Sequence, residues 1–493
     1  MKKKPFDFTK SLLFRYRFYI GQSIFIIVFL SLLALTYFNS VHLLSTGEMA
    51  SAVNSHRLSF WGFFNGDFVD MPYRLLQNLS IRFFGLSAFA IKLPSIVLGI
   101  ISAIITALLI NRWHTTNVSI ITSILIVPTV FFLSVVNAGT PAVMLILYPA
   151  LLLWLGSKIV AKQALPSPFA YFMFAGVLGL AFYTPYLPYI ALICATSLFN
   201  PRIRMHIKSF SKLKLSLVVA TFMLVIIPII INIFTAGHSV LRLFVPEDLS
   251  IATLWANFSE AIASLTRFSS AGSWPIFTPA LGLAIAAIAI VGLIIIIPNR
   301  QTTRYQTVIA FFVLFAVASA LDPAYVVLAF IPIAILVAAG VKFILDEWYG
   351  LFPTNPYARL FGGAFVVMFS TVIVVSNVYF CMYAVHHITS IANSYDSTLD
   401  SLVERLEDND TIYTSQNQYE FYNLLALTHN VHITTELQQD PSQIPSRLIS
   451  IGEPTRRLDN MQLSEIVTSP RYQDGDLFYI YDTINKVEEN NEE

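Results

Sequence analysis

The feature that most constrains this chain is a series of apolar stretches, most of them long enough to cross a lipid bilayer. About 20 apolar residues in an α-helix span the hydrocarbon core of a membrane. Of the 493 residues 56% are hydrophobic and only 12% are charged, whereas an average soluble domain has roughly 25% charged residues. The sequence therefore predicts an α-helical polytopic membrane protein. We expect about eleven spans, at 18–38, 89–110, 118–136, 142–160, 168–184, 187–199, 215–235, 277–297, 307–321, 325–342 and 361–385.

The distribution of basic residues indicates the orientation of these spans. Eleven spans with the N-terminus inside place the C-terminus outside, and cytoplasmic loops of membrane proteins carry an excess of Lys and Arg. With this arrangement the inner segments contain 18 Lys and Arg residues, and the outer segments before residue 390 contain six. The basic run at 201–214 contributes most to the inner count after the N-terminus. We therefore expect a plasma-membrane protein with its N-terminus in the cytoplasm.

The chain divides into a membrane part and a hydrophilic tail. Residues 1–389 are predicted to form the transmembrane domain, with outer loops at 40–88 and 236–275. Residues 390–493 contain 19 of the 29 acids. Short β-like runs at 411–415, 431–436 and 476–484 alternate with helical patterns at 399–407 and 419–428, which predicts a small α/β domain outside the membrane with a disordered end.

The first outer loop concentrates polar residues in an otherwise apolar protein, so it is the candidate site. It contains three carboxylates, Glu48, Asp67 and Asp70. Asp67 also fits a turn, and Asp70 also fits an ion pair with Arg74 four residues on. A metal site built from His42, Glu48 and His56 has no recognisable ligand spacing. Cys194 and Cys381 lie far apart in apolar runs and are interpreted as buried small side chains.

The order of these features resembles the GT-C glycosyltransferases, in particular the protein mannosyltransferases and the aminoarabinose transferases of lipid A, as in glycosyltransferase family 39. Members have one helix, a long outer loop opening with an acidic pair, an amphipathic helix near a Pro-containing turn, and a characteristic entry into the second span. The resemblance covers roughly residues 15–200, and more loosely 305–345. The matching segments here are Thr46-Gly47-Glu48-Met49-Ala50, Met71-Pro72-Tyr73, Phe84-Gly85-Leu86-Ser87 continuing to Lys92-Leu93-Pro94-Ser95, and the later Asp322-Pro323-Ala324-Tyr325.

The resemblance implies a glycosyltransferase that takes its sugar from a polyprenyl-phosphate donor. A carboxylate then acts as general base on the acceptor, and cations bind the leaving phosphate. The family's usual catalytic Asp falls on Gly47 here, so Glu48 is the candidate base, with Asp70 or Asp67 second. The candidate phosphate ligands are the arginines of the two outer loops, Arg57, Arg74, Arg82, Arg242 and Arg267.

The expected partners follow from the same resemblance: a polyprenyl-phosphate sugar donor, membrane lipid, and a protein or glycolipid acceptor on the outer face, with no nucleic acid. No cofactor is required by the sequence, and a divalent metal is possible but unsupported. Gly47 also leaves open a catalytically inactive envelope scaffold or binding protein. A transporter of lipid-linked substrate is a third reading, although no inverted repeat and no charged residue in the middle of a span supports it.

Overall fold

The computed structural model describes residues 12–484, apart from 60–61, 65, 161–167, 198–203, 206–210, 236, 247–249, 267–279, 299–301, 354, 437–444, 453–460 and 470–475. Helices form most of it. Most of the basic run at 201–214 lies outside the described residues. The helices up to the middle of the chain are α1 (Leu12–Ser40), α2 (Thr46–His56), η2 (Gly62–Phe64), α3 (Met71–Phe84), α4 (Ala88–Trp113), α5 (Thr116–Ile126), α6 (Val130–Asn137), η3 (Pro141–Val143), α7 (Met144–Val160), α8 (Pro168–Ala181), η4 (Leu187–Tyr189), α9 (Ile190–Ser197), α11 (Lys212–Thr235) and α12 (Gly237–Leu241).

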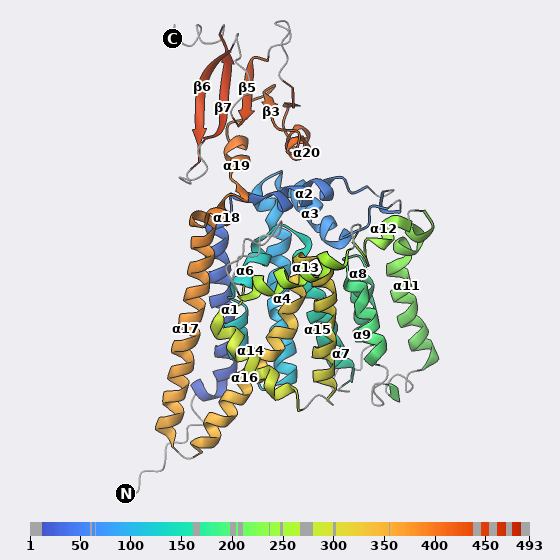
Figure 1. Cartoon of the computed structure of the whole chain (residues 1–493), viewed down its shortest axis with the longest axis vertical. Coiled ribbons are helices and arrows are strands. Elements are labelled where there is room, and N and C mark those ends of the chain that lie inside the picture. Colours follow the sequence, from blue (N-terminus) through green and yellow to red (C-terminus); the bar gives the residue numbers. More distant parts are fainter. Residues whose placement is uncertain are drawn as a thin grey trace.

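The second half of the chain continues the bundle and then leaves it. The remaining helices are α13 (Ile251–Thr266), α14 (Leu283–Ile296), α15 (Thr303–Leu321), η5 (Pro323–Ala329), α16 (Phe330–Leu351), α17 (Pro356–His387), α18 (Thr389–Ala392), α19 (Thr398–Val403), α20 (Tyr419–Tyr422) and η6 (Leu425–Leu427). Long helices run side by side in one block, whereas α2 and α3 lie across one end of it (Figure 1).

The described helices support a multi-span membrane protein. Six of them are long and apolar enough to cross a membrane, and a seventh span arises if α5 and α6, bent by 67°, are counted together. Every one of the eleven predicted segments coincides with a helix or helix pair, but α8, α14 and α15 are shorter apolar helices and α9 has eight residues. The multi-span architecture is thus confirmed, and the count of eleven stays a prediction.

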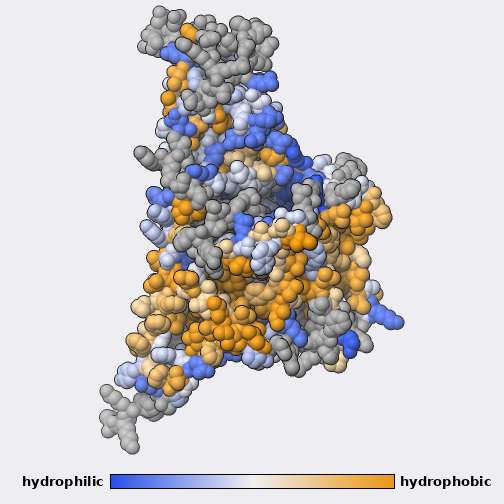
Figure 2. Space-filling model, in the orientation of Figure 1, coloured by the Kyte–Doolittle hydropathy of each residue, from blue (hydrophilic) through white to orange (hydrophobic). Residues whose placement is uncertain are grey.

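The surface has the pattern expected for a protein in a bilayer. On the face shown in Figure 2, apolar side chains form a broad band across the helical block, and hydrophilic side chains gather above it. The outer helices expose large apolar side chains to this band, for example Phe234 of α11, which is 85% exposed. In water such exposure would be costly, whereas lipid tails match it.

The tail forms a small mixed sheet above the bundle (Figure 1). The strand order is β4-β3-β5-β7-β6, with β3 parallel to β4 and β5, and β7 antiparallel to β5 and β6. The predicted strands at 411–415, 431–436 and 476–484 are present, whereas β5 and β6 were not predicted. The bounds are β3 (Thr411–Tyr413), β4 (His432–Thr434), β5 (Arg447–Ile451), β6 (Met461–Thr468) and β7 (Asp476–Thr483).

The tail is attached to the first outer loop as well as to α17. Strand β1 (Leu44–Ser45) pairs antiparallel with β2 (Tyr395–Asp396). A single apolar cluster contains Met49 and Val53 of α2 together with Leu402 and Phe421 of the tail. The loop and the tail therefore fold against each other.

The beginning of α1 and the tail lie at opposite ends of the helical block (Figure 1), as an odd number of crossings requires. We expect a membrane-impermeant maleimide applied to intact cells to label Asn417→Cys in the tail and not Thr9→Cys near the N-terminus, in a background in which Cys194 and Cys381 are replaced by Ser. After the cells are opened both variants should react. Labelling of Thr9→Cys alone in intact cells would invert the orientation.

Candidate functional site

Helix α2 begins at a capping box that includes Glu48. Ser45 is the N-cap, and its hydroxyl accepts a hydrogen bond from the Glu48 N–H at 3.3 Å. The Glu48 carboxylate accepts in return from the Ser45 N–H at 2.7 Å. This reciprocal pair satisfies two N–H groups at the start of the helix, and the carboxylate also lies at the positive end of the helix dipole.

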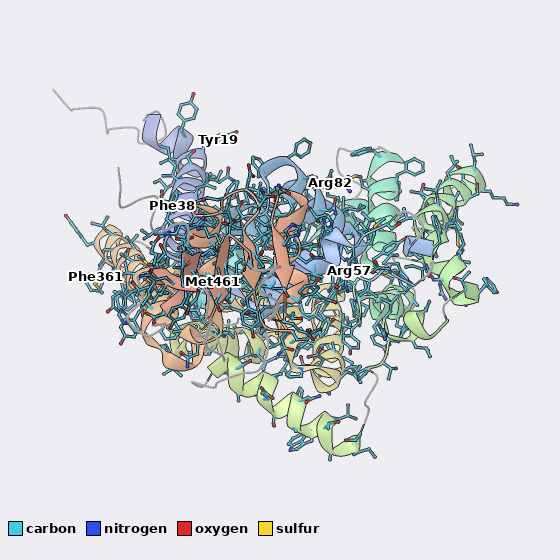
Figure 3. The ribbon with its side chains drawn as sticks, turned by 90° about the horizontal axis from the view of Figure 1, so that it is seen from above. Tyr19, Phe38, Arg57, Arg82, Phe361 and Met461 are labelled. Atoms are coloured by element: carbon cyan, nitrogen blue, oxygen red, sulfur yellow. The ribbon has the colours of Figure 1, made fainter. Side chains whose placement is uncertain are left out.

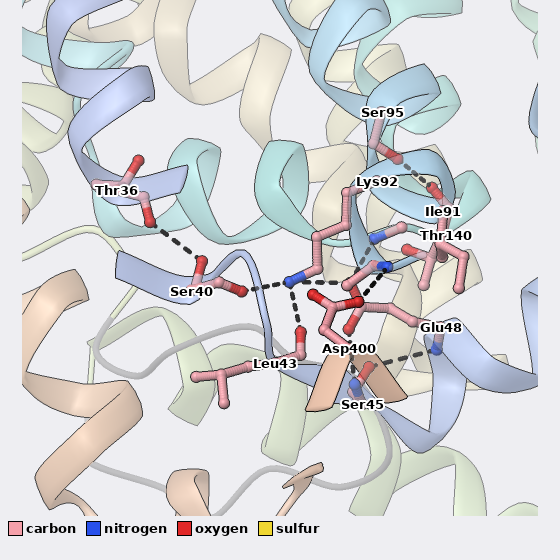
Figure 4. A network of polar contacts seen from close by, with 12 residues as sticks. Thr36, Ser40, Leu43, Ser45, Glu48, Ile91, Lys92, Ser95, Thr140 and Asp400 are labelled. Atoms are coloured by element: carbon pink, nitrogen blue, oxygen red, sulfur yellow. Dashed lines mark hydrogen bonds and ion pairs between the residues drawn. The ribbon is translucent and has the colours of Figure 1, made fainter. Parts of the chain in front are cut away.

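The second oxygen of Glu48 joins α2 to the start of α4. Oε1 accepts a hydrogen bond from the Gly139 N–H at 2.7 Å and lies 3.9 Å from the ammonium of Lys92. Both side chains are almost fully buried, with exposures of 1% and 2%. Lys92 also donates to the carbonyls of Ser40, at 2.7 Å, and Leu43 (Figure 4). We call these contacts the Glu48–Lys92 node.

The chemistry expected of Glu48 is not favoured by this geometry. The surroundings of Glu48 are those of a structural carboxylate, because it is almost fully buried, each of its oxygens accepts a backbone N–H, and it is paired with Lys92 rather than with one of the predicted arginines; its role as general base stays a prediction. Of the three residues considered for a metal site, His42, Glu48 and His56, the first pairs with Asp400 at 2.8 Å. Within the part of the chain that the structure describes, no group of three His, Cys, Asp or Glu side chains could hold a metal ion.

Asp67 is engaged in a second ion pair. The guanidinium of Arg74 contacts both Asp67 oxygens, with 3.0 Å between Nη2 and Oδ2, and it also donates to the Asn54 carbonyl of α2. The side chain of Arg74 is 9% exposed and that of Asp67 is 42% exposed. The sequence allowed Asp70 as the partner of Arg74, but Asp67 takes this position.

Asp70 has a different environment from the other two acids. It precedes α3 with a left-handed backbone, φ 53°, and its side chain makes no cap bond to the helix. Non-glycine residues adopt this conformation rarely and at an energetic cost. The backbone is fixed there because the Asp70 N–H donates to the Tyr183 carbonyl at 2.8 Å, and the Asp70 carbonyl accepts from Tyr73 and Arg74.

The carboxyl of Asp70 is buried with incomplete pairing. Its Oδ1 is among the buried atoms that have no hydrogen-bond partner in the described part of the chain. Burial raises the pKa of Asp70 from 3.8 to about 7, and the neighbouring Thr184 hydroxyl and Arg74 guanidinium act in the opposite direction. Such a group changes its charge near neutral pH, which structural carboxylates rarely do.

Asp70 interacts electrostatically with Tyr73 and with two tyrosines from distant parts of the sequence, Tyr148 and Tyr325. The ring of Tyr325 packs edge-to-face against Tyr186 with 4.4 Å between centroids. Asp322, whose pKa is raised by burial, acts on the same two tyrosines. The sequence pointed to the Asp322–Tyr325 segment, but nothing in it indicated the contribution of Thr184 or Tyr186.

The predicted phosphate ligands occupy separate places. Arg57 forms an exposed ion pair with Glu420 of the tail at 2.5 Å, and Arg82 is exposed in the last turn of α3 (Figure 3). Arg242 is exposed just after α12, next to Leu243, whose carbonyl accepts from Tyr186 N–H at 2.8 Å. Arg267 lies outside the described residues. Two of the candidates therefore lie close to Asp70 along the backbone. Arg74 N–H donates to the Asp70 carbonyl, and Arg242 precedes Leu243, which binds the segment that contains Tyr183 and Tyr186.

The fold is that of a multi-pass membrane protein and is similar to the fold of GT-C glycosyltransferases. Residues 72–231 match the family model described as dolichyl-phosphate-mannose-protein mannosyltransferase. The apo crystal structure of ArnT from Cupriavidus metallidurans is similar over 95% of this chain and 99% of that chain, with a TM-score of 0.51 and 13% identity. The apo oligosaccharyltransferase of Archaeoglobus fulgidus is similar over 86% of this chain and 65% of that chain, with a TM-score of 0.51 and 11% identity.

A comparison of the sequence with curated proteins gave no match. The predicted resemblance to the GT-C glycosyltransferases is confirmed by the shared fold and by the family model over residues 72–231. The matched segment begins after Glu48, Asp67 and Asp70, so it does not assign a role to any of the three.

The Glu48–Lys92 node predicts that the effects of substitutions at Glu48 and Lys92 on the free energy of unfolding are not additive. Lys92→Met leaves the Glu48 charge buried and unpaired, and the free energy of unfolding should fall by about 3–5 kcal/mol. The double variant Glu48→Gln with Lys92→Met should recover most of that loss, because neither charge remains. Unfolding in mixed micelles measures both, and Lys342→Met, at an exposed position of α16, is the matched control. Additive losses in the double variant would contradict the pairing.

The burial of Asp70 predicts that the free energy of unfolding depends on pH. Between pH 4 and pH 7 the folded protein keeps a proton on Asp70 that the unfolded chain releases, because the folded pKa is about 7 and the ordinary value is 3.8. This group therefore lowers stability as pH rises through that window and has a constant effect above it. Asp70→Asn should gain stability relative to the wild type as pH rises from 4 to 7. A difference that does not vary with pH would show that Asp70 titrates normally.

Proposed function

We propose that this protein is an integral membrane glycosyltransferase that transfers a sugar from a polyprenyl-phosphate donor to an acceptor on the outer face of the plasma membrane. The observation that carries the proposal is the Asp70 carboxyl, which is buried, has an unpaired oxygen and has a pKa of about 7. Asp70 is the general base in this proposal.

The chemistry required of the base matches these properties. An acceptor hydroxyl or amine must lose a proton as it attacks the anomeric carbon, and the phosphate leaves from the opposite face. A base is most effective when its pKa is close to the working pH, because it is then ionised and still strong enough to take the proton. The free Oδ1 of Asp70 offers the lone pair, and its burial restricts the access of water.

The remaining acids have supporting roles. Asp67 holds the guanidinium of Arg74 against the Asn54 carbonyl, which fixes a cation next to Asp70. Glu48 fixes the start of α2 and its connection to Lys92. This division assigns catalysis to one of the three predicted carboxylates and positioning to the other two.

The donor follows from the family description and from the cations near Asp70. The description of the matched family names a sugar donor linked to dolichyl phosphate. The sequence contains no nucleotide-binding motif, so a nucleotide-sugar donor is not indicated. Leu243, next to Arg242, packs with Phe68 and Tyr183 in one apolar cluster, so the second outer loop meets the first just before Asp70. Arg74 and Arg242 are the proposed phosphate ligands, because charge-assisted hydrogen bonds to phosphate are the strongest available.

The test is sugar transfer in cells that lack the native protein and carry a variant. Asp70→Asn keeps the size and one acceptor oxygen but cannot take a proton at neutral pH, so transfer should fall about 100-fold or more. Mass spectrometry of envelope glycans and glycoproteins measures the product, and the same membranes give the expression level. Asp408→Asn, an exposed acid of the tail, is the matched control and should leave the product unchanged.

The pH dependence separates a base from a structural acid. Transfer by wild-type membranes should decrease about tenfold per pH unit below the pKa of the base, which is about 7. Full transfer by Asp70→Asn would reject Asp70 as base. Loss of the protein without any change in envelope glycans would instead favour a catalytically inactive scaffold, the alternative suggested by Gly47.

A further inference from the structure

The side chain of Asp400, in α19 of the tail, contacts two separate parts of the membrane domain. Its Oδ1 accepts a hydrogen bond from the Ala88 N–H at 3.2 Å, and its Oδ2 lies 2.8 Å from Nδ1 of His42. The Asp400 side chain is 22% exposed and that of His42 is 70% exposed. These contacts join residues separated by 312 and 358 positions in the sequence.

The Ala88 contact places a negative charge at the beginning of a long helix. Ala88 is the first residue of α4, and the hydroxyl of its N-cap, Ser87, accepts only from the Ala90 N–H. A carboxylate at this end is favoured by the helix dipole and satisfies a backbone donor that the helix leaves open. Lys92, one turn further along α4, is attracted to both Glu48 and Asp400. Asp400 thus extends the Glu48–Lys92 node into the tail (Figure 4).

The tail also contacts this region through strand β2. Ser45, the N-cap of α2, pairs with Tyr395 in the β1–β2 ladder. Tyr395 also lines a small pocket with Ser40 and Lys92. The start of α2 and the start of α4 are therefore both fixed by the segment 395–400.

The position of α2 determines the position of α3, which begins next to Asp70. The hydroxyls of Ser51 and Ser55 donate to Oε1 of Gln77 at 2.8 and 2.7 Å. The Gln77 amide nitrogen donates to the carbonyls of Ile91, at 3.0 Å, and Gly139, at 2.9 Å. Arg74 of α3 binds the Asn54 carbonyl of α2. Buried hydrogen bonds of this kind transmit a displacement of α2 to α3 because no side chain can move alone.

We propose that Asp400 is a positioning residue, through which the C-terminal domain fixes α2 and α3 and so the placement of Asp70. The catalytic part of this inference rests on the proposed function. The structural part does not: in it, the contacts of the Asp400 side chain with Ala88 and His42 keep the first outer loop ordered.

The test is amide hydrogen exchange of the full-length protein in lipid nanodiscs. In Asp400→Ala, exchange at 44–57 and 71–78 should rise about tenfold or more, whereas α16 in the bundle core keeps its protection. Asp400→Asn keeps an acceptor oxygen for the Ala88 N–H and should restore part of the protection. Asp408→Asn should match the wild type. A rise confined to the tail, or one that includes α16 equally, would overturn the proposal.

The pH dependence of sugar transfer provides a second test. It would not change if Asp400 only stabilised the fold. If α3 loosens in Asp400→Ala, water reaches the Asp70 carboxyl and its pKa falls toward the ordinary value. The pH below which sugar transfer declines should then be lower than in the wild type by more than half a unit. An unmoved limb with lower total transfer would reject positioning of Asp70. Hydrogen exchange is measured without substrate, so the two proposals can fail independently. If Asp70→Asn is inactive but exchange in Asp400→Ala is unchanged, the proposed function is kept and the positioning role of Asp400 is rejected.

Discussion

The buried pairing of Lys92 with Glu48 is the interaction on which the outer half of this protein depends. An ammonium with 2% exposure is tolerable only where its charge is compensated and its N–H groups are bound. Both conditions hold because Lys92 donates to the carbonyls of Ser40, the last residue of α1, and Leu43, and because Glu48 in the first turn of α2 lies beside it. The pair therefore does more than stabilise: it permits only one relative arrangement of α1, α2 and α4.

Close packing around the node adds a steric condition to the electrostatic one. A side chain at Gly139 would bring its Cβ within 2.8 Å of Ile91 Cγ2 and 3.0 Å of the Ile91 carbonyl. Only glycine lets the turn after α6 approach α4 closely enough for its N–H to reach Glu48. The turn after α6 thus has a structural task, because its Gly139 N–H binds Glu48.

The features that could be predicted from the sequence are those set by local pattern. Apolar runs predicted the positions of the long helices, and short β-like runs predicted β3, β4 and β7. The importance of the first outer loop also followed from its polar residues. The assignment of roles within it did not, because Glu48, Asp67 and Asp70 are equivalent in a sequence. Their differences arise from Gly139, Arg74 and Tyr183, which local pattern does not connect to them. The contact of Asp400 with Ala88 has no local signal at all.

The joining of the first outer loop to the tail also constrains the order of biogenesis. Ala88 is synthesised 312 residues before Asp400, which at typical elongation rates is a delay of roughly 15–60 s. In the predicted orientation the loop crosses the membrane during that interval, while β2 and α19 do not yet exist. The Ala88 N–H then lacks its Asp400 acceptor, although Ser87 already caps the Ala90 N–H. Completion of this end of the protein therefore depends on the synthesis and translocation of the tail.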